Sequence, residues 1–388
     1  MGKYKLINNV LGWIVFAIAS TVYLMTMEPT ASFWDCGEFI SSAYKLEVGH
    51  PPGAPFFMLT ANLFTQLASD PSTVAKMVNT MSALFSGLTI LFLFWSITHL
   101  ARKIMVKDGE EASLGQMITV MGSGLVGALA YTFSDTFWFS AVEGEVYAYS
   151  SLFTAVVFWL ILKWEAVADK PHADRWIVLI AYLMGLSIGV HLLNLLCIPA
   201  IVLVYYYKKL PNPTMKGTLV ALLASFAIVA LMMYGVVQGL VEVCGYFELL
   251  FVNVLGMPYN SGVFAYVIIV AGVLIWSIWE TMRDEIHPTR MKIAFILSVV
   301  LIGIPFIGSG YVLAVILTAA LSLYLFKSKK VDIKTLNTIL VCLMVVVVGY
   351  SSYALTLIRA TADTPMNQNA PSDIFTLRTY LAREQYGK

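Results

Sequence analysis

Two carboxylates and a histidine lie close together in the sequence, directly after the first long apolar segment. Asp35 and Glu38 belong to residues 33–39 (FWDCGEF), and His50 is in residues 49–53 (GHPPG). If residues 35–39 are helical, the i,i+3 spacing puts both acids on one face. Aromatic neighbours that exclude water would raise their pKa toward the range of a general base. Asp35 and Glu38 are therefore the candidate catalytic residues.

Each of these residues also has a structural alternative. Asp35 could simply cap a short helix at the membrane interface, as Asp commonly does. His50 precedes a rigid Pro-Pro-Gly turn that fixes where its imidazole points, but it could also be an ordinary turn histidine. The sequence leaves these alternatives open.

A second acidic group lies in residues 134–146 (SDTFWFSAVEGEV). Its carboxylates are Asp135, Glu143 and Glu145, and Trp138 and Phe139 lie between them. Their functional role as a group would be a second wall of the same cleft. Taken singly, each is better explained as a surface acid.

Two basic residues are candidates for binding a lipid phosphate. His191 falls in an apolar segment, where an ionisable side chain is costly and usually functional. It could instead make a structural hydrogen bond between helices. Arg359 follows the last apolar segment and could bind phosphate through its guanidinium, or extend its charge to the membrane surface.

The sequence predicts no particular cofactor. The acids could hold a divalent cation, but no ligand spacing demands a metal. No Walker motif occurs, and no G-x-G-x-x-G follows a predicted strand, so soluble nucleotide chemistry is not expected. A net charge of +1 gives no sign of nucleic-acid binding.

The composition indicates a membrane protein whose helices must position these residues. Hydrophobic residues make up 59% of the chain and charged residues 12%, against about 25% charged in soluble domains. Mean hydropathy is +0.79. We therefore expect an all-α polytopic membrane protein. The apolar segments are 10–27, 74–100, 115–133, 147–164, 176–207, 218–238, 262–281, 293–308, 310–326 and 335–358.

The distribution of Lys and Arg predicts how the chain is threaded. Clusters lie within 3–5, 102–107, 163–175, 208–216, 283–292 and 327–334, and the positive-inside rule places them in the cytoplasm. This is consistent only if 176–207 enters and returns as two short helices that meet near His191. About eleven crossings result, with the N-terminus inside.

The remaining segments form the outer side. We expect outer loops at 28–73, 134–146 and 239–261, with 54–68 as an embedded or juxtamembrane helix begun after Pro51-Pro52. Residues 1–358 would form the membrane domain. The polar tail 359–388 would lie outside the cytoplasm and begin a separate soluble region.

The four cysteines do not define a disulfide framework. Cys197 and Cys342 lie in apolar segments, where cysteine is usually a small packing residue. Cys36 and Cys244 fall in predicted outer loops, so a disulfide between them is one alternative.

Four motifs together resemble a known family. Residues 34–39 (WDCGEF), 49–53 (GHPPG), 143–147 (EGEVY) and 185–194 (GLSIGVHLLN) resemble a bacterial membrane-protein family of unassigned function. Its eukaryotic relatives are endoplasmic-reticulum protein O-mannosyltransferases, and it is similar to the GT-C superfamily of glycosyltransferases. The resemblance implies a GT-C-like bundle, a polyprenyl-phosphate sugar donor, and an outer-loop acid as the catalytic residue, a position that Asp35 matches.

The predicted function is transfer of a mannose-like sugar to a Ser or Thr hydroxyl of a secreted or membrane protein. Asp35 would act as base in a displacement that inverts the anomeric carbon. His50, His191 and Arg359 would bind the donor phosphate. We expect a bacterial inner-membrane enzyme that faces outward. A transporter or flippase for lipid-linked sugars is the main alternative, and a scaffold for a soluble domain is another.

Overall fold

A computed structural model describes residues 2–107, 109–308, 311–328 and 331–387, and helices with no strands make up its elements. Within these residues, eight helices are long and apolar enough to span a membrane, and three more apolar helices are shorter. An all-α polytopic membrane protein is thus confirmed. The expected count of eleven crossings is not confirmed. Lys329 and Lys330 of the last basic cluster lie outside the described residues.

The chain divides into two compact units. Unit 1 comprises residues up to Gly49, Ala54–Trp176 and Ser187–Lys209, and unit 2 comprises His50–Gly53, Ile177–Leu186 and residues from Leu210 onward. Both units contain parts of the predicted membrane domain 1–358.

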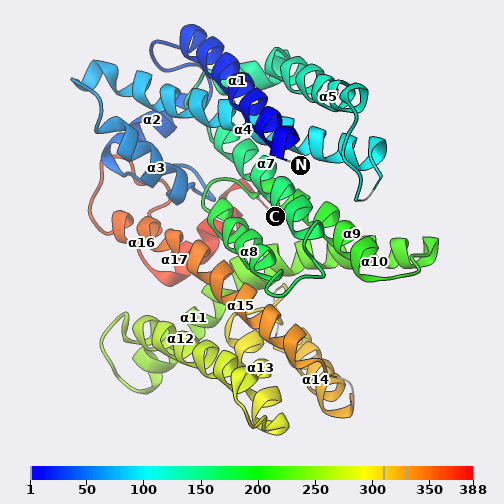
Figure 1. The fold of residues 1–388 in the computed structure, drawn as a ribbon. Coiled ribbons are helices and arrows are strands. Elements are labelled where there is room, and N and C mark those ends of the chain that lie inside the picture. The colour runs from blue at the N-terminus through cyan, green and yellow to red at the C-terminus, as the bar shows by residue number, and fades with distance from the viewer. Residues whose placement is uncertain (1, 108, 309–310, 329–330, 388) are drawn as a thin grey trace. The chain divides into compact units, whose positions relative to one another are not determined.

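Unit 1 contains the first half of the helices (Figure 1). They are α1 (Gly2–Thr26), α2 (Cys36–Lys45), α3 (Pro55–Thr65), α4 (Val74–Met105), α5 (Leu114–Thr132), α6 (Asp135–Ala141), α7 (Val146–Glu165), the 3-10 turn η2 (Leu192–Cys197) and α9 (Ile198–Lys209). The core lies where α1, α4 and α5 pack, around buried Tyr23, Phe94 and Met121. Because α4 also packs on α3 and α7, it is the central helix of this unit.

The apolar segment 176–207 is broken as the sequence predicts. The helix α8 (Arg175–Ile188) ends before Gly189, and the helical path resumes at Leu192. The carbonyl of Gly189 accepts hydrogen bonds from the backbone N–H of Phe56 (2.7 Å) and of Phe57 (3.2 Å). These N–H groups belong to the first turn of α3 and have no acceptor within that helix. The break therefore supplies the acceptor that anchors α3.

Unit 2 contains the remaining helices. They are α10 (Met215–Ala230), the π-helices η3 (Leu231–Gln238) and η4 (Leu250–Val254), α11 (Gly239–Leu249), α12 (Ser261–Met282), α13 (Pro288–Leu301), α14 (Tyr311–Lys327), α15 (Ile333–Tyr350), α16 (Ala354–Ala360) and α17 (Ile374–Leu381). One core cluster joins α13, α14 and α15 through Phe295, Leu325 and Leu340.

The expected third outer loop, 239–261, is helical as far as Val254, so its prediction as a loop is wrong. Its acids are bound within the fold: Glu242 accepts from the Tyr246 hydroxyl, and buried Glu248 accepts from the backbone N–H of Asn260 at 2.6 Å. The polar tail is also folded, since Leu377 and Tyr380 of α17 are buried and α17 packs on α11.

Candidate active site

Asp35 and Glu38 lie at the start of α2, as the spacing predicts. Asp35 occupies the N-cap position, and its carbonyl accepts from the N–H of Phe39 at 2.9 Å. Its carboxylate makes no capping hydrogen bond and is exposed. The alternative that Asp35 serves only as a helix cap is therefore not supported, because its carboxylate is directed elsewhere.

The aromatic residues beside Asp35 do not pack against the rest of the protein. Phe33 and Trp34 are each 86% exposed, and the exclusion of water from Asp35 at the membrane interface stays a prediction. Trp34 has a φ of 63°, a left-handed conformation that bulky residues rarely adopt. Such backbone strain persists where the surrounding structure enforces it, often at functional sites. Here it precedes the residue that presents the exposed carboxylate.

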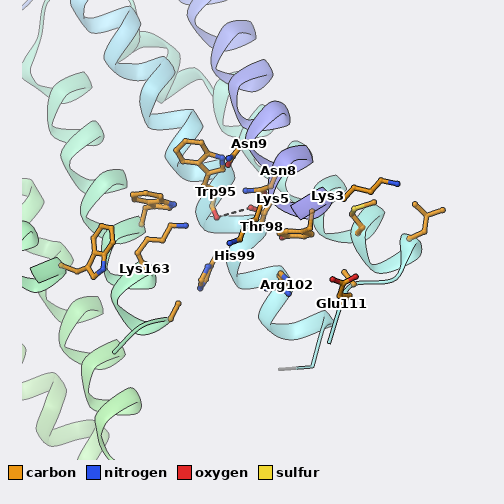
Figure 2. Close-up of a pocket in the computed structure, with 17 residues that line it drawn as sticks. Lys3, Lys5, Asn8, Asn9, Trp95, Thr98, His99, Arg102, Glu111 and Lys163 are labelled. Carbon is orange, nitrogen blue, oxygen red and sulfur yellow. Dashed lines mark hydrogen bonds between the residues drawn. The ribbon is translucent and has the colours of Figure 1, made fainter. Parts of the chain in front are cut away.

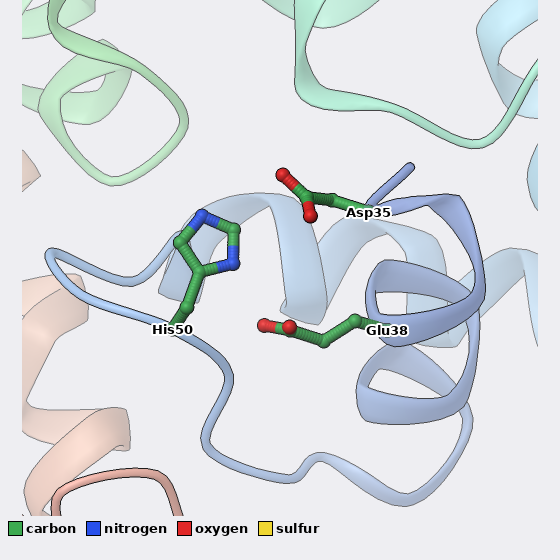
Figure 3. Close-up of side chains that lie close together, drawn as sticks. All are labelled: Asp35, Glu38 and His50. Carbon is green, nitrogen blue, oxygen red and sulfur yellow. The ribbon is translucent and has the colours of Figure 1, made fainter. Parts of the chain in front are cut away.

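Figure 3 shows Asp35, Glu38 and His50 pointing toward one another. One ligand atom from each lies within 4.8 Å of the others. Gly49 lies close to this group, since a Cβ at that position would lie 2.6 Å from Glu38 Oε1 and the carboxylate would have to shift. Two carboxylates and an imidazole could hold a divalent cation or exchange a proton.

The turn that bears His50 is held in place within unit 2. The N–H of Gly53 donates to the carbonyl of His50 at 2.9 Å, and Gly53 has a φ of +73° that favours glycine. The Tyr353 hydroxyl donates to the Gly53 carbonyl at 3.3 Å. The tight turn expected from the motif is confirmed.

The second acidic loop lies against residues 28–36 of the first, and both of these segments belong to unit 1. Glu143 and Glu145 are buried, with 5% and 6% of their surface exposed. Burial raises the pKa of the Glu143 carboxyl, while hydrogen bonds from Ser32 and Cys36 act in the opposite direction. Burial also raises the pKa of the Cys36 thiol, and the carboxylates of Glu143 and Glu145 add to this. Cys36 therefore keeps its proton and donates a hydrogen bond to Glu143. All four cysteines are free thiols in the structure, so it contains no disulfide between Cys36 and Cys244.

Backbone contacts hold the two loops together. The N–H of Glu28 donates to the carbonyl of Val142 at 3.0 Å. Asn79 of α4, fully buried, donates to the carbonyls of Glu28 (2.7 Å) and Thr30 (3.0 Å). A Cβ at Gly144 would lie only 3.0 Å from Asn79 Oδ1 and from Ile40 Cγ1. Glycine between the two glutamates thus lets the second loop approach both α2 and α4.

His191 and Tyr147 lie at the same end of unit 1. Their rings are 5.5 Å apart, and the Tyr147 hydroxyl is within electrostatic range of Glu145 and Asp35. His191 Nδ1 accepts from the N–H of Leu193 at 3.1 Å, which caps η2. Because Nδ1 accepts this hydrogen bond, a neutral imidazole carries its proton on Nε2.

Two predicted residues are not part of the group described in unit 1. Asp135 is exposed in the first turn of α6, where its charge favours the helix N-terminus. It is not among the carboxylates that act on Cys36. Arg359 lies in unit 2, in the last turn of α16, where a positive charge favours the helix C-terminus.

The sequence reasoning gave no role to Tyr147, Asn79 or Ser32. Tyr147 belongs to the EGEVY motif, and it is 46% exposed although it begins a membrane helix. Asn79 could have been noticed as a polar side chain in a long apolar segment. The sequence contains no signal for Ser32, because only the packing of the two loops brings it to Glu143.

Comparison with known proteins gives consistent matches. Residues 35–214 match the family model of the N-terminal domain of protein O-mannosyl-transferase TMEM260. Protein O-mannosyl-transferase TMEM260 of Mus musculus is 28% identical over 174 residues, 45% of this chain and 22% of the relative. The Dictyostelium discoideum protein of the same name is 25% identical over 187 residues, 47% of this chain and 21% of the relative.

These matches have a limited extent. The matched region makes up about a fifth of the length of either relative, and no solved structure matches the chain. Both of these relatives are eukaryotic, so a bacterial inner membrane stays a prediction. The resemblance to membrane protein O-mannosyltransferases that the motifs predict is confirmed, and it is consistent with the GT-C superfamily.

Proposed function

We propose that this chain is the membrane part of a glycosyltransferase that transfers a mannose-like sugar from a polyprenyl phosphate to a protein hydroxyl. The observation that supports this most directly is the carboxylate of Asp35. It is exposed, makes no helix-capping hydrogen bond, and begins the region that matches the O-mannosyltransferase family. A base that must accept a proton from a substrate needs such an accessible and uncommitted oxygen.

In the proposed reaction, the Ser or Thr hydroxyl of the acceptor protein hydrogen-bonds to Asp35. Asp35 takes the hydroxyl proton as the oxygen bonds to the anomeric carbon of the sugar. The bond between that carbon and the phosphate oxygen breaks, and polyprenyl phosphate leaves with the electron pair. A single displacement of this kind inverts the anomeric centre.

The other residues have supporting roles in this proposal. Glu38, Glu143 and Glu145 would bind and orient the acceptor, because their carboxylates accept hydrogen bonds from hydroxyl groups. Asp135, which is exposed in the first turn of α6, would have only a minor role in binding the acceptor. His50, His191 and Arg359 would meet the donor phosphate, each by donating a hydrogen bond to it. The reaction would take place on the outer face of the membrane, opposite the basic clusters.

The direct test is transfer of radiolabelled mannose from polyprenyl phosphate to an acceptor protein by the purified protein. Asp35→Asn keeps the size of the side chain but removes the base, so the rate should fall at least ~100-fold. Asp135→Asn is the matched control and should leave most of the activity. Wild-type turnover by the Asp35→Asn protein would remove Asp35 from the mechanism.

The same assay tests whether the transfer reaction requires a divalent metal ion. The proposed displacement uses no metal ion, so transfer should continue in EDTA. Loss of transfer in EDTA, with recovery on adding Mn²⁺, would instead assign Asp35, Glu38 and His50 to a cation site.

Transport of a lipid-linked sugar is the second candidate. The break between α8 and η2 favours it, because discontinuous helices are common at transporter substrate sites. Sealed vesicles loaded with the lipid-linked sugar discriminate between the two. A flippase would move the sugar lipid between leaflets without any acceptor, and Asp35→Asn would not abolish that movement.

A further inference from the structure

Unit 1 contains a large cavity at the end of its helices remote from Asp35. The cavity has a volume of about 1070 Å³ and lies among the start of α1 and the ends of α4 and α7. The other end of α1 leads into the loop that bears Asp35. Because a helix rises 1.5 Å per residue, the 25 residues of α1 separate the two places by roughly 37 Å.

The lining of this cavity is strongly basic. It includes Lys3 and Lys5 from α1, Arg102 from α4 and Lys163 from α7, against the single carboxylate of Glu111 among the described lining residues. In Figure 2, Lys163 extends from α7 toward α4, which bears His99 and Arg102. The cavity therefore concentrates positive charge from three helices.

Aromatic rings hold these cations in place. The guanidinium of Arg102 lies 5.0 Å from the ring centre of Tyr4, and Lys163 Nζ lies 4.7 Å from the ring centre of Trp159. Neighbouring Lys103, by contrast, forms an ion pair with Glu165. Cations positioned by rings keep their N–H groups available to an anion.

The lining also has hydrogen-bond donors without acceptors. Among the described residues, Arg102 Nε, Trp95 Nε1 and Trp176 Nε1 are buried and have no acceptor, and the Asn8 Oδ1 acceptor has no donor. Buried polar groups in proteins are nearly always partnered. The excess of donors favours a ligand that is rich in acceptor oxygens.

We propose that this cavity binds the phosphate of an anionic membrane-lipid headgroup. A phosphate has the negative charge and the oxygens that the lining lacks. The tryptophans suit the level of the lipid headgroups, where Trp is enriched in membrane proteins. Basic pockets between membrane helices bind such headgroups. Free inorganic phosphate has the same chemistry, and the experiment separates the two sources.

The test measures binding to the purified protein in an uncharged detergent, followed by tryptophan fluorescence. Short-chain phosphatidylglycerol should bind saturably, whereas phosphatidylcholine of the same chain length should not. Lys163→Gln and Arg102→Gln should each weaken the Kd for phosphatidylglycerol at least about 10-fold, as loss of a charge-assisted hydrogen bond does. If inorganic phosphate binds as tightly as phosphatidylglycerol, and with the same loss in both variants, the ligand is a free phosphate group.

A matched control separates a built site from general attraction to negative lipid. Lys107→Gln removes the same charge at an exposed position outside the cavity, and should weaken binding only about fivefold or less. Equal effects of all three substitutions would overturn the proposal, as would equal binding of the two lipids. Lys5→Gln, on the exposed side of α1, replaces either cavity variant that fails to fold.

Discussion

The carboxylates at the proposed active site are of two kinds. Asp35 is exposed and makes no capping hydrogen bond, whereas Glu143 is buried and receives hydrogen bonds from Ser32 and Cys36. An exposed acid can exchange its partner for a substrate, while a buried and bonded acid holds its neighbours in position. In the proposed mechanism, Asp35 transfers the proton, and Glu143 holds the second loop in the position from which it would orient the acceptor.

The raised pKa of Glu143 predicts a pH dependence of stability. Because the folded protein holds this proton more tightly than the unfolded chain, the contribution to stability is complete below the unfolded pKa. It is lost as the pH rises through the folded pKa. Glu143→Gln removes this dependence, so thermal unfolding of the variant should vary less as the pH rises above the ordinary glutamate pKa of 4.5. Identical pH profiles for the two proteins would show that Glu143 does not titrate differently on folding.

His191 predicts a specific kinetic effect on the lipid donor. If Nε2 binds the donor phosphate in ground and transition states alike, His191→Ala should raise KM for the donor more than it lowers kcat. One charge-assisted hydrogen bond corresponds to roughly a 10- to 150-fold change. Donor titrations of the transfer reaction measure it.

A matched variant separates binding from capping at the same position. His191→Asn retains a side-chain oxygen that can cap η2 but loses the imidazole Nε2. It should therefore raise KM as His191→Ala does. Normal KM in the Asn variant, with raised KM in the Ala variant, would show that His191 acts only as the cap observed at Leu193.

For single residues, the sequence predicts which neighbours in the chain share a helix face. It does not predict contacts between loops that are distant in the sequence. The shared position of Asp35 and Glu38 follows from helical spacing. The hydrogen bond between Cys36 and Glu143 depends on how α2 packs beside the second loop. The exposure of Phe33 and Trp34 also depends on packing, which a list of apolar residues does not determine.

At the scale of the elements, small residues set how closely helices approach. A Cβ at Gly185 of α8 would lie 2.5 Å from the carbonyl oxygen of Val346 in α15, and one at Gly349 would lie 2.5 Å from the N–H nitrogen of Leu186. Membrane helices commonly pack through such small residues, because lipid gives no hydrophobic drive to associate. The G-x-x-x-G pattern at 185–189 therefore has a packing role at its first glycine.

This contact predicts the effect of adding one methyl group. Gly185→Ala should destabilise the protein by about 1–3 kcal/mol, because backbone cannot move aside as a flexible side chain can. Gly272→Ala in α12 is the control, since nothing lies within 4 Å of a Cβ there, and alanine favours helix by about 1 kcal/mol. Thermal unfolding in one detergent compares them. Equal stability of the two variants would mean that α8 and α15 do not pack closely.

Helix breaks were easier to predict than loops. The break near His191 follows from a 32-residue apolar segment that is too long for one crossing. The segment 239–261 is predicted as a loop because it lies between the apolar segments 218–238 and 262–281, yet it is mostly helical. Glu242 accepts a hydrogen bond from the Tyr246 hydroxyl, and Glu248 accepts one from the Asn260 N–H. These hydrogen bonds offset the cost of placing the two acids in helices.

For the whole molecule, sidedness follows from the basic clusters. The cavity cations Lys5, Arg102 and Lys163 gather at one end of unit 1, and Asp35 and Glu145 gather at the other. The positive-inside rule therefore predicts that the cavity lies on the cytoplasmic side of the membrane and the acids on the outer side. A donor phosphate and a translocated acceptor would meet on the acidic side.

Single-cysteine labelling with a membrane-impermeant thiol reagent tests this arrangement in intact cells. Thr136→Cys and Tyr259→Cys should react from outside, and Lys107→Cys, Pro171→Cys and Asn212→Cys should not. All five positions are exposed, so a lack of reaction reports sidedness and not burial. Labelling at Lys107 also reports on position 108, which is predicted to be cytoplasmic but lies outside the described residues.

The outcome at Lys107 is the most informative one, because it depends on α3. The 11 residues of α3 are about half of the ~20 that a full crossing needs, and its first turn is anchored on the carbonyl of Gly189. Because α3 is too short to cross, the chain should leave it on the same side of the membrane as it entered. The helix α4 should then cross from outside to inside. Labelling of Lys107→Cys from outside, together with protection of Thr136→Cys, would mean that α3 crosses completely. The proposed outer position of Glu143 and Glu145 would then be wrong.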